Sequence, residues 1–94
     1  MITEKQLLEW GFEKEQTILE TTYMFAISTC SRNGLTVPNE YVYVDIERRE
    51  VSIGYAHNYI FLANCTTKRK ANQALRLLNL PPIDKLSTLK QEAK

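Results

Sequence analysis

The stretch Tyr41–Tyr55, with the sequence YVYVDIERREVSIGY, decides the fold, because two runs of alternating apolar residues flank a short charged segment. The alternating residues are Val42, Val44 and Ile46 before that segment and Val51, Ile53 and Tyr55 after it. This period of two predicts an antiparallel hairpin with one apolar face and Glu47–Glu50 as its loop. The predicted partners, which match apolar residues throughout, are Ile46 with Val51, Val44 with Ile53, and Val42 with Tyr55.

The residues before this hairpin predict another strand. Tyr23, Phe25 and Ile27 occupy every second position, in the aromatic and β-branched mix that is typical of a strand. Ser31–Gly34 is a turn signal, because Asn and Gly tolerate positive φ angles. Pro38 has no N–H group to donate, so we expect the next strand to begin after it.

The residues after the hairpin predict a fourth strand and a helix. His57-Asn58 indicates a turn, and Tyr59–Cys65 a strand with apolar residues on both faces, as in a central or helix-covered strand. Thr66 or Thr67 can cap the helix that follows, and Pro81-Pro82 ends it. The apolar face of that helix comprises Ala71, Ala74, Leu75 and Leu78, widened by Leu77 and Leu80.

The N-terminal residues predict a short helix. Thr3 and Gln6 have the spacing of a capping box, and Gly11 can adopt the left-handed conformation that ends a helix. The polar residues 13–21 lack a clear period, and we expect them to form an extended lead-in to the sheet.

These elements together predict an α+β domain in the order α-β-β-β-β-α. It is an antiparallel four-stranded meander with a short N-terminal helix and a C-terminal helix. We expect one domain over residues 1–94, with its ordered core over about residues 1–80. The Pro-led tail, residues 81–94, has apolar residues at a three-residue spacing that suits a weak terminal helix.

Size and composition bear on where the chain works. Hydrophobic residues make up 44% of the 94 residues, enough for a core without metals or disulfides. Nothing resembles a signal peptide or a spanning helix, so we expect a cytoplasmic protein without a membrane partner. Cys30 and Cys65 are then expected to be free thiols. A homo-oligomer would bury apolar area that so small a domain leaves exposed.

The side chains that carry most enzyme chemistry are scarce. The single histidine, His57, and the two cysteines fit no metal-ligand spacing, and no nucleophile stands at a catalytic spacing from His57. Asp45 and Glu47 share one face of a strand and could form a carboxylate pair, but a polar, solvated outer face is the commoner explanation. The three glycines form no phosphate-binding loop. We therefore expect no catalytic residue, no metal and no cofactor, and a protein that is not an enzyme.

A tyrosine-bearing sheet face is the first candidate binding surface. If the valines of the hairpin face the core, Tyr41, Tyr43 and Asp45 point the other way, near Arg48 and Arg49. Tyrosine and arginine are enriched at protein interfaces, which favours a protein partner. The alternative is that a helix covers this face and the tyrosines are structural.

A basic helix start is the second candidate surface. Thr67, Lys68, Arg69 and Lys70 combine cations with free backbone N–H groups at the predicted start of the last helix. A solvated basic turn, or pairing with the acidic N-terminal segment, would account for the same residues. The net charge of +1 is low for a dedicated nucleic-acid binder, so a nucleic acid or phosphate ligand is the alternative partner.

Features spread over most of the chain resemble a class of small phage and mobile-element accessory proteins. They are Leu7-Leu8, Gly11-Phe12-Glu13, the tyrosine- and valine-rich stretch Tyr41–Tyr55 and the closing leucine-rich helix. The resemblance implies a protein that binds and blocks or redirects a host protein, and in some cases inhibits a bacterial defence system. The residues and the resemblance thus predict a non-enzymatic protein-interaction module, with an inhibitor of a host or defence protein as the implied role.

Overall fold

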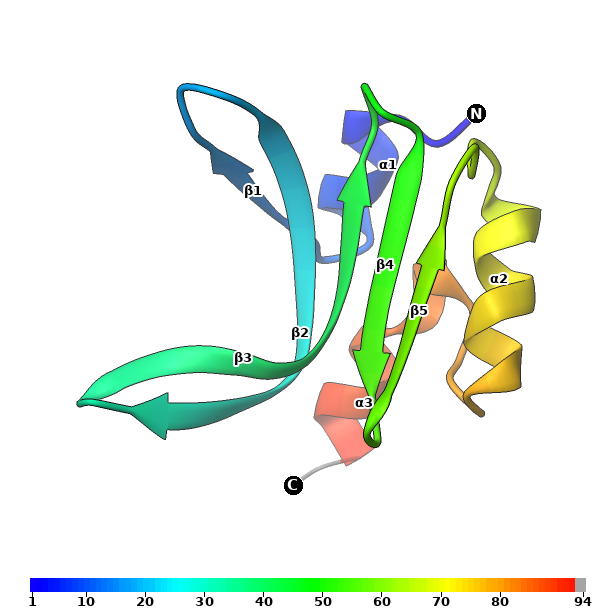
Figure 1. Ribbon diagram of the computed structural model, residues 1–94. Helices are drawn as coiled ribbons and strands as arrows, with labels where there is room; N and C mark the ends of the chain where they lie inside the picture. Colours follow the sequence, from blue (N-terminus) through cyan, green and yellow to red (C-terminus); the bar gives the residue numbers. More distant parts are fainter. Residues whose placement is uncertain (93–94) are drawn as a thin grey trace.

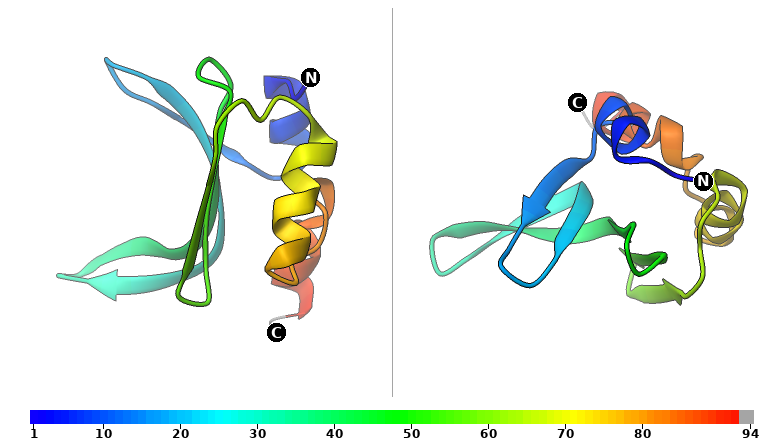
Figure 2. Two further views of the ribbon diagram at one scale, coloured as in Figure 1. Left: turned by 45° about the vertical axis from the view of Figure 1, so that its right-hand side comes forward. Right: turned by 90° about the horizontal axis from the view of Figure 1, so that it is seen from above.

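The computed structural model describes residues 1–92, which form one antiparallel sheet with all of its helices on the same side (Figures 1 and 2). The strands follow one another across the sheet: β1 (Glu13–Gln16), β2 (Thr21–Arg32), β3 (Leu35–Asp45), β4 (Glu50–Tyr55) and β5 (Asn58–Leu62). The helices are α1 (Glu4–Glu9), α2 (Lys68–Leu77), the short 3-10 helix η1 (Ile83–Lys85) and α3 (Ser87–Glu92). The α+β class and the antiparallel meander are confirmed, with five strands instead of four.

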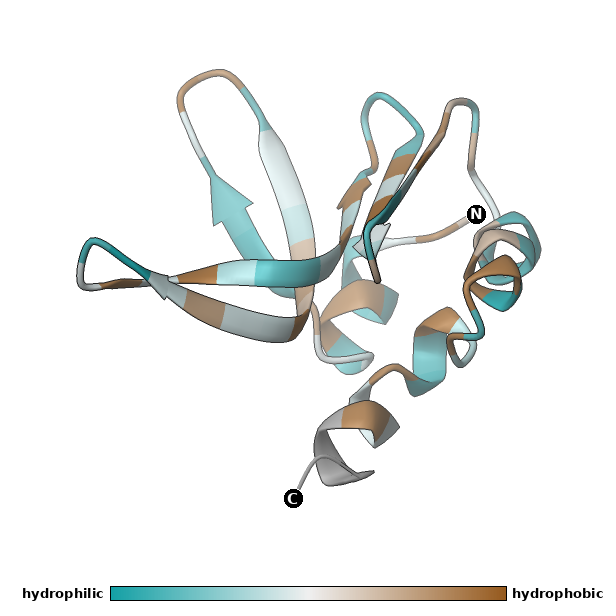
Figure 3. Cartoon of the chain, turned by 60° about the horizontal axis from the view of Figure 1, so that its bottom comes forward, coloured by the Kyte–Doolittle hydropathy of each residue, from teal (hydrophilic) through white to brown (hydrophobic). Residues whose placement is uncertain are grey.

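The additional strand is β1, which lies in the segment that we expected to be an extended lead-in. Its residues, EKEQ, are all exposed, and they pair with Thr21–Met24 of β2. Strand prediction relies on apolar alternation, and β1 has none, as its hydrophilic colour in Figure 3 shows. Its place at the sheet edge explains this composition, because charged side chains there hinder pairing with another chain.

The far ends of β2 and β3 form a two-stranded arm, residues 28–39, which projects beyond the rest of the sheet (Figure 1). β3 begins at Leu35, so the expectation that it would begin after Pro38 was wrong. Pro38 lies opposite Thr29, whereas β4 pairs with β3 only from Tyr41 onward. In the arm, β3 has a neighbouring strand on one side only. Backbone N–H groups on its other side donate no hydrogen bond to a strand, so a proline is tolerated there.

The β3–β4 hairpin has the predicted faces but not the predicted partners. Val44 lies opposite Val51, and Val42 lies opposite Ile53, a register shifted by two residues from the predicted one. A shift of two residues leaves every side chain on its original face, so the apolar pattern alone does not distinguish the two registers.

The turn of this hairpin sets the register. It comprises residues 46–49, one residue earlier than the predicted loop. The Arg48 N–H donates to Asp45 Oδ1 at 3.0 Å, and Arg49 adopts a left-handed conformation with φ of 57°. The Arg49 carbonyl also accepts a hydrogen bond from the Cys65 N–H at 2.7 Å, which ties the turn to the segment after β5.

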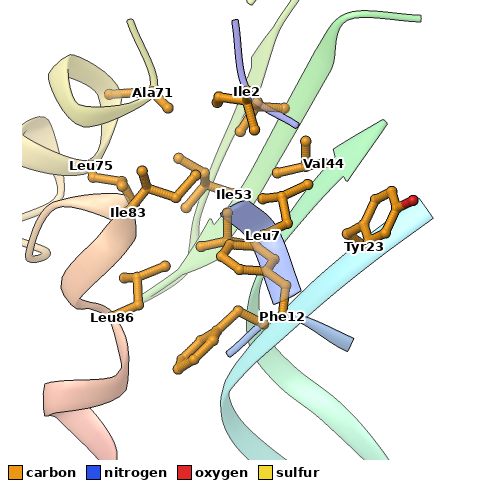
Figure 4. Close-up of a cluster of buried hydrophobic side chains, with 14 of the residues drawn as sticks. Ile2, Leu7, Phe12, Tyr23, Val44, Ile53, Ala71, Leu75, Ile83 and Leu86 are labelled. Atoms are coloured by element: carbon orange, nitrogen blue, oxygen red, sulfur yellow. The ribbon is translucent and has the colours of Figure 1, made fainter. Parts of the chain in front are cut away.

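One apolar core lies between the sheet and the helices. Figure 4 shows side chains from both layers converging, among them Ile2, Leu7, Val44, Ile53, Ala71, Leu75, Ile83 and Leu86. The capping box predicted for α1 is confirmed: the Gln6 N–H donates to Thr3 Oγ1 at 3.3 Å, and the Thr3 N–H donates to Gln6 Oε1 at 3.0 Å. Gly11 follows α1 with φ of 97°, as expected for a residue that ends a helix.

The core extends past residue 80, where we expected it to end. Ile83 and Leu86 are fully buried, and the Ile83 N–H donates to Asn72 Oδ1 of α2 at 2.8 Å. Leu77, expected to widen the apolar face of α2, is instead 79% exposed. The segment after the prolines is thus part of the helical layer, whereas the side chain of Leu77 lies outside the core.

Two further expectations concern the membrane and the thiols. Among residues 1–92, no helix is both long and apolar enough to cross a bilayer. Cys30, on the arm, and Cys65, buried after β5, are both free thiols, as expected. Burial raises the pKa of the Cys65 thiol above its usual value.

Candidate functional site

The sheet face opposite the helices carries the tyrosines that the sequence singled out. We call it the outer face: Glu13 and Glu15 on β1, Thr22, Met24 and Ala26 on β2, Tyr41, Tyr43 and Asp45 on β3, Glu50, Ser52 and Gly54 on β4, and Tyr59 and Phe61 on β5. No helix of the described chain lies over it (Figure 2). The alternative in which a helix covers these tyrosines therefore does not hold for residues 1–92.

Tyrosine rings form the centre of the outer face. Tyr41 and Tyr43 are half-buried and meet edge to face, with ring centroids 5.1 Å apart. Gly54 lies opposite Tyr41, and a β-carbon on Gly54 would stand 2.9 Å from the Tyr41 ring. The absence of a side chain at Gly54 is therefore what allows the Tyr41 ring to lie across β4.

β5 adds two exposed rings to this face. Tyr59 is 63% exposed and Phe61 50% exposed, whereas Ile60 and Leu62 on the other face pack against the core. β5 is an edge strand that ends at Leu62, so the expectation of a central strand over residues 59–65 was wrong, and the helices cover only the face that bears Ile60 and Leu62. The apolar residues of β5 therefore have two roles. Ile60 and Leu62 complete the core, whereas Tyr59 and Phe61 are exposed on the outer face.

Two shallow hollows meet at Tyr41 and Tyr59. The acidic hollow, of about 350 Å³, extends toward β1 and is lined by Tyr43 together with the carboxylates of Glu15, Glu20, Asp45 and Glu50. The turn hollow, of about 360 Å³, extends toward the β4–β5 turn and is lined by Glu40, Tyr55 and His57 among others. Both hollows are lined by Tyr41 and Tyr59, so they adjoin on the outer face, and we call the two together the groove.

Negative charge predominates in the acidic hollow, where Arg48 is the only cation that the described part of the chain, residues 1–92, contributes to the lining. Arg48 Nη1 lies 3.1 Å from Glu20 Oε2, and its Nε lies 3.9 Å from Asp45 Oδ2. Partial burial raises the pKa of the Tyr43 hydroxyl, and the negative charge of Glu15 acts in the same direction. The tyrosine hydroxyl thus stays neutral, and the charge of the hollow comes from its carboxylates.

The loop between β1 and β2 presents two aliphatic side chains beside this hollow. Ile18 is fully exposed and Leu19 is 89% exposed. Thr17 holds the loop: its Oγ1 accepts hydrogen bonds from the N–H groups of Leu19 and Glu20, at 3.3 and 3.1 Å, and its N–H donates to the Glu20 carbonyl at 2.8 Å. Figure 3 shows this hydrophobic loop at the end of the hydrophilic strand β1. The loop thus displays Ile18 and Leu19 on a hydrogen-bonded turn.

Of the five partner-binding residues predicted from sequence, the structure gathers Tyr41, Tyr43, Asp45 and Arg48 around one hollow. It places Arg49 elsewhere, beside Met1 and Cys65. Five further residues on or beside the outer face were not predicted from sequence: Glu15, Ile18, Leu19, Tyr59 and Phe61. Adjacent aliphatic residues inside an otherwise polar stretch are the signal that could have pointed to Ile18 and Leu19.

The turn hollow contains His57, the single histidine of the chain. His57 is exposed, and with Ala56 it forms a turn in which both residues have positive φ, 67° and 50°. Glu40 stabilises this turn, because its carboxylate accepts hydrogen bonds from the Ser28 hydroxyl at 2.8 Å and from the Ala56 N–H at 2.9 Å. Glu40 therefore ties the turn to the base of the arm.

The predicted basic helix start lies on the other layer, at α2. Thr67 is the N-cap, and its Oγ1 accepts a hydrogen bond from the Lys70 N–H at 3.2 Å. Lys68 pairs with Asp84 at 3.0 Å and lies over the Trp10 ring, 5.8 Å from its centroid. The structure thus divides the predicted set: Lys68 joins the contacts between the helices.

Arg69 and Lys68 both line a shallow hollow of about 610 Å³ along α2, together with Asn72, Gln73 and Arg76. Lys70 does not line this hollow; its Nζ donates to the Asn64 carbonyl at 3.4 Å.

Comparisons of the chain with protein-family models, with curated proteins and with solved structures gave no match. The interpretation of the outer face therefore rests on its own geometry.

Proposed function

We propose that this chain is a non-enzymatic protein-interaction module that binds its partner through the outer face. The surface comprises the groove around Tyr41, Tyr43 and Asp45, the exposed rings of β5 and the Ile18–Leu19 loop. An inhibitor of a host or defence protein, the role implied by the resemblance to phage accessory proteins, is the form of the proposal that we favour.

One observation carries the proposal: the helices cover one face of the sheet, and the uncovered face bears aromatic rings around a groove. Large exposed rings on a folded protein are costly to leave in water and are enriched at interfaces. Tyrosine adds a hydrogen-bonding hydroxyl to its apolar ring, which suits a surface that is wet when free and buried when bound.

A capture experiment tests the proposal. The full chain is immobilised, a bacterial lysate is passed over it, and retained proteins are identified by mass spectrometry; the complex is then reconstituted from purified components and its mass is measured in solution. We expect the variant Tyr41→Ala/Tyr43→Ala to lose the retained partner. Leu77→Ala, which removes an exposed leucine from α2, is the matched control and should retain it.

Circular dichroism and a denaturant titration of each variant show whether it remains folded. Undiminished binding of the partner by a folded Tyr41→Ala/Tyr43→Ala variant would contradict the proposal. Mass in solution also separates a partner complex from a homo-oligomer.

The second candidate function is binding of a nucleic acid or a phosphate ligand at α2. It is favoured by the hollow where Lys68, Arg69 and Arg76 lie along one side of the helix. Binding to phosphates through these cations would weaken steeply as salt increases. A labelled oligonucleotide titrated with the full chain and with Arg69→Ala/Arg76→Ala tests it; binding that is insensitive to salt and to these substitutions would contradict it.

A further inference from the structure

We propose that the acidic hollow receives an arginine- or lysine-bearing segment of the protein partner. This inference rests on the proposed function and adds to it the chemistry of the partner. The occupant is a cationic polypeptide segment that lies in the groove, with a basic side chain against the rings of Tyr41, Tyr43 and Tyr59.

Charge complementarity is the first argument. Among residues 1–92, four carboxylates and one cation line the hollow, which gives this described lining a net charge of −3: Glu15, Glu20, Asp45, Glu50 and Arg48. The whole chain has a net charge of +1, so the residues outside this lining have a net charge of +4. A partner that covered these carboxylates without supplying cations would bury uncompensated charge.

The existing ion pairs do not neutralise the negative charge of the acidic hollow. Arg48 is 60% exposed at the rim, and its guanidinium is already shared between Glu20 and Asp45. Glu15 and Glu50 lie on the strands to either side, on β1 and β4, and both line the hollow. An incoming cation can therefore reach carboxylates from both sides of the rings.

The rings favour an organic cation. Guanidinium and ammonium groups bind over tyrosine faces, and a guanidinium also donates paired hydrogen bonds to carboxylates. Among residues 1–92, no group of three or more His, Cys, Asp or Glu side chains is arranged to hold a metal ion. The distribution of carboxylates around a ring cluster fits a long basic side chain better than a compact divalent ion.

The same charges disfavour the other macromolecular partners at this face. Phosphates of a nucleic acid or of anionic lipid headgroups would be repelled by the four carboxylates. Neutral or acidic protein segments remain as outcomes that the experiment distinguishes.

The experiment selects binders from a library of short random peptides displayed on phage, with the full chain immobilised at physiological salt. We expect enriched peptides to carry a net positive charge and to contain arginine or lysine at a recurring position. Individual enriched peptides are then synthesised with a fluorescent label, and their affinity for the full chain is measured by anisotropy at low and at high salt.

Two charge-reversed variants make the test specific. Glu15→Lys/Glu50→Lys changes the lining of the hollow, and Glu9→Lys/Glu47→Lys makes the same change in net charge at exposed positions that do not line it. We expect the first variant to bind the peptides about tenfold more weakly or worse, and the control variant to bind like the original chain. Asp45 is left unchanged because it caps the β3–β4 turn.

The outcomes separate this inference from the function on which it rests. Neutral or acidic enriched peptides, equal binding by Glu15→Lys/Glu50→Lys, or no enrichment of any peptide would each overturn the cationic-segment proposal. If the enriched peptides are not basic but lose binding to Tyr41→Ala/Tyr43→Ala, the outer face is still the binding surface and only the inferred chemistry fails. If basic peptides bind that tyrosine variant undiminished, the role of the rings is wrong.

Discussion

The two faces of this sheet are built from the same strands and serve opposite purposes. On β4, Ile53 is fully buried against the helical layer, while the adjacent Ser52 lies on the outer face and lines the acidic hollow. On β3, Val42 and Val44 are buried, and Tyr41 and Tyr43 alternate with them. The alternation of side chains between the faces thus lets one face form the core, while the other carries aromatic rings and charges.

The largest expected effect comes from breaking the inner face at Ile53. We expect Ile53→Ala to lower the free energy of unfolding by about 2–5 kcal/mol, because it removes buried methyl groups and leaves a cavity. Ser52→Ala, one residue away on the outer face, should change it by less than about 0.5 kcal/mol. Denaturant titrations followed by circular dichroism measure both; equal losses would contradict the division between the faces.

Gly54→Ala probes the contact between β4 and the rings of the outer face. A β-carbon there would stand 2.9 Å from the Tyr41 ring, so the ring must shift. We expect a loss of about 1–3 kcal/mol, as for other overpacked sites, together with weaker partner binding. Denaturation gives the first quantity, and the chemical shifts of the Tyr41 ring report its displacement. An unshifted ring would mean that the glycine is not needed for packing.

The Lys68–Asp84 pair provides a test that depends on pH. The pair lowers the pKa of Asp84 below its usual value of 3.8. Stability from this carboxylate is therefore present above the usual pKa and is lost as the pH falls through it toward the lower folded-state pKa. Asp84→Asn should reduce this loss on acidification, with an effect below about 1 kcal/mol because the pair is partly exposed.

Unfolding titrations of both proteins across the acidic range measure the Asp84 effect. Identical pH profiles for the two would show that the pair does not contribute to stability.

A similarly small effect on stability is expected at Ile18 and Leu19, which lie at the tip of the β1–β2 loop. The double variant Ile18→Ser/Leu19→Ser should change the free energy of unfolding by no more than about 0.5 kcal/mol, because neither side chain is buried. We expect it to weaken partner binding nonetheless, since it removes apolar surface beside the groove. The loop variant should therefore affect binding more than stability, whereas Ile53→Ala should mainly affect stability. A large loss of stability in the loop variant would show that Ile18 and Leu19 contribute to the fold.

The faces of the β3–β4 hairpin could be predicted because alternation alone determines them. The register could not, because Val44 pairs apolar with apolar whether its partner is Ile53 or Val51. The turn decides between them through the cap from Asp45 and the left-handed Arg49. These are details of turn geometry that Arg-Arg does not signal.

The candidate site was predicted only in part, because the local pattern does not show how the strands are placed in the sheet. Tyr41 and Tyr43 follow from the hairpin pattern, whereas Glu15 reaches the site only because the polar β1 pairs with β2. Tyr59 and Phe61 looked like residues of a buried strand, since an edge strand with apolar residues on both faces has the same local sequence as a central one. An edge strand differs from a central strand in its position in the sheet, and the local sequence pattern does not report that position.

The neighbour-by-neighbour order of the strands has a consequence for how the chain folds. Each strand pairs with the one that precedes or follows it, so the sheet can grow by successive short loop closures, which favours rapid folding. A link between residues far apart in sequence is made at the start of the chain, where the Ile2 N–H donates to the Thr66 carbonyl at 2.9 Å and α1 packs against the core. We therefore expect the hairpins to assemble first and the N-terminal helix to dock last.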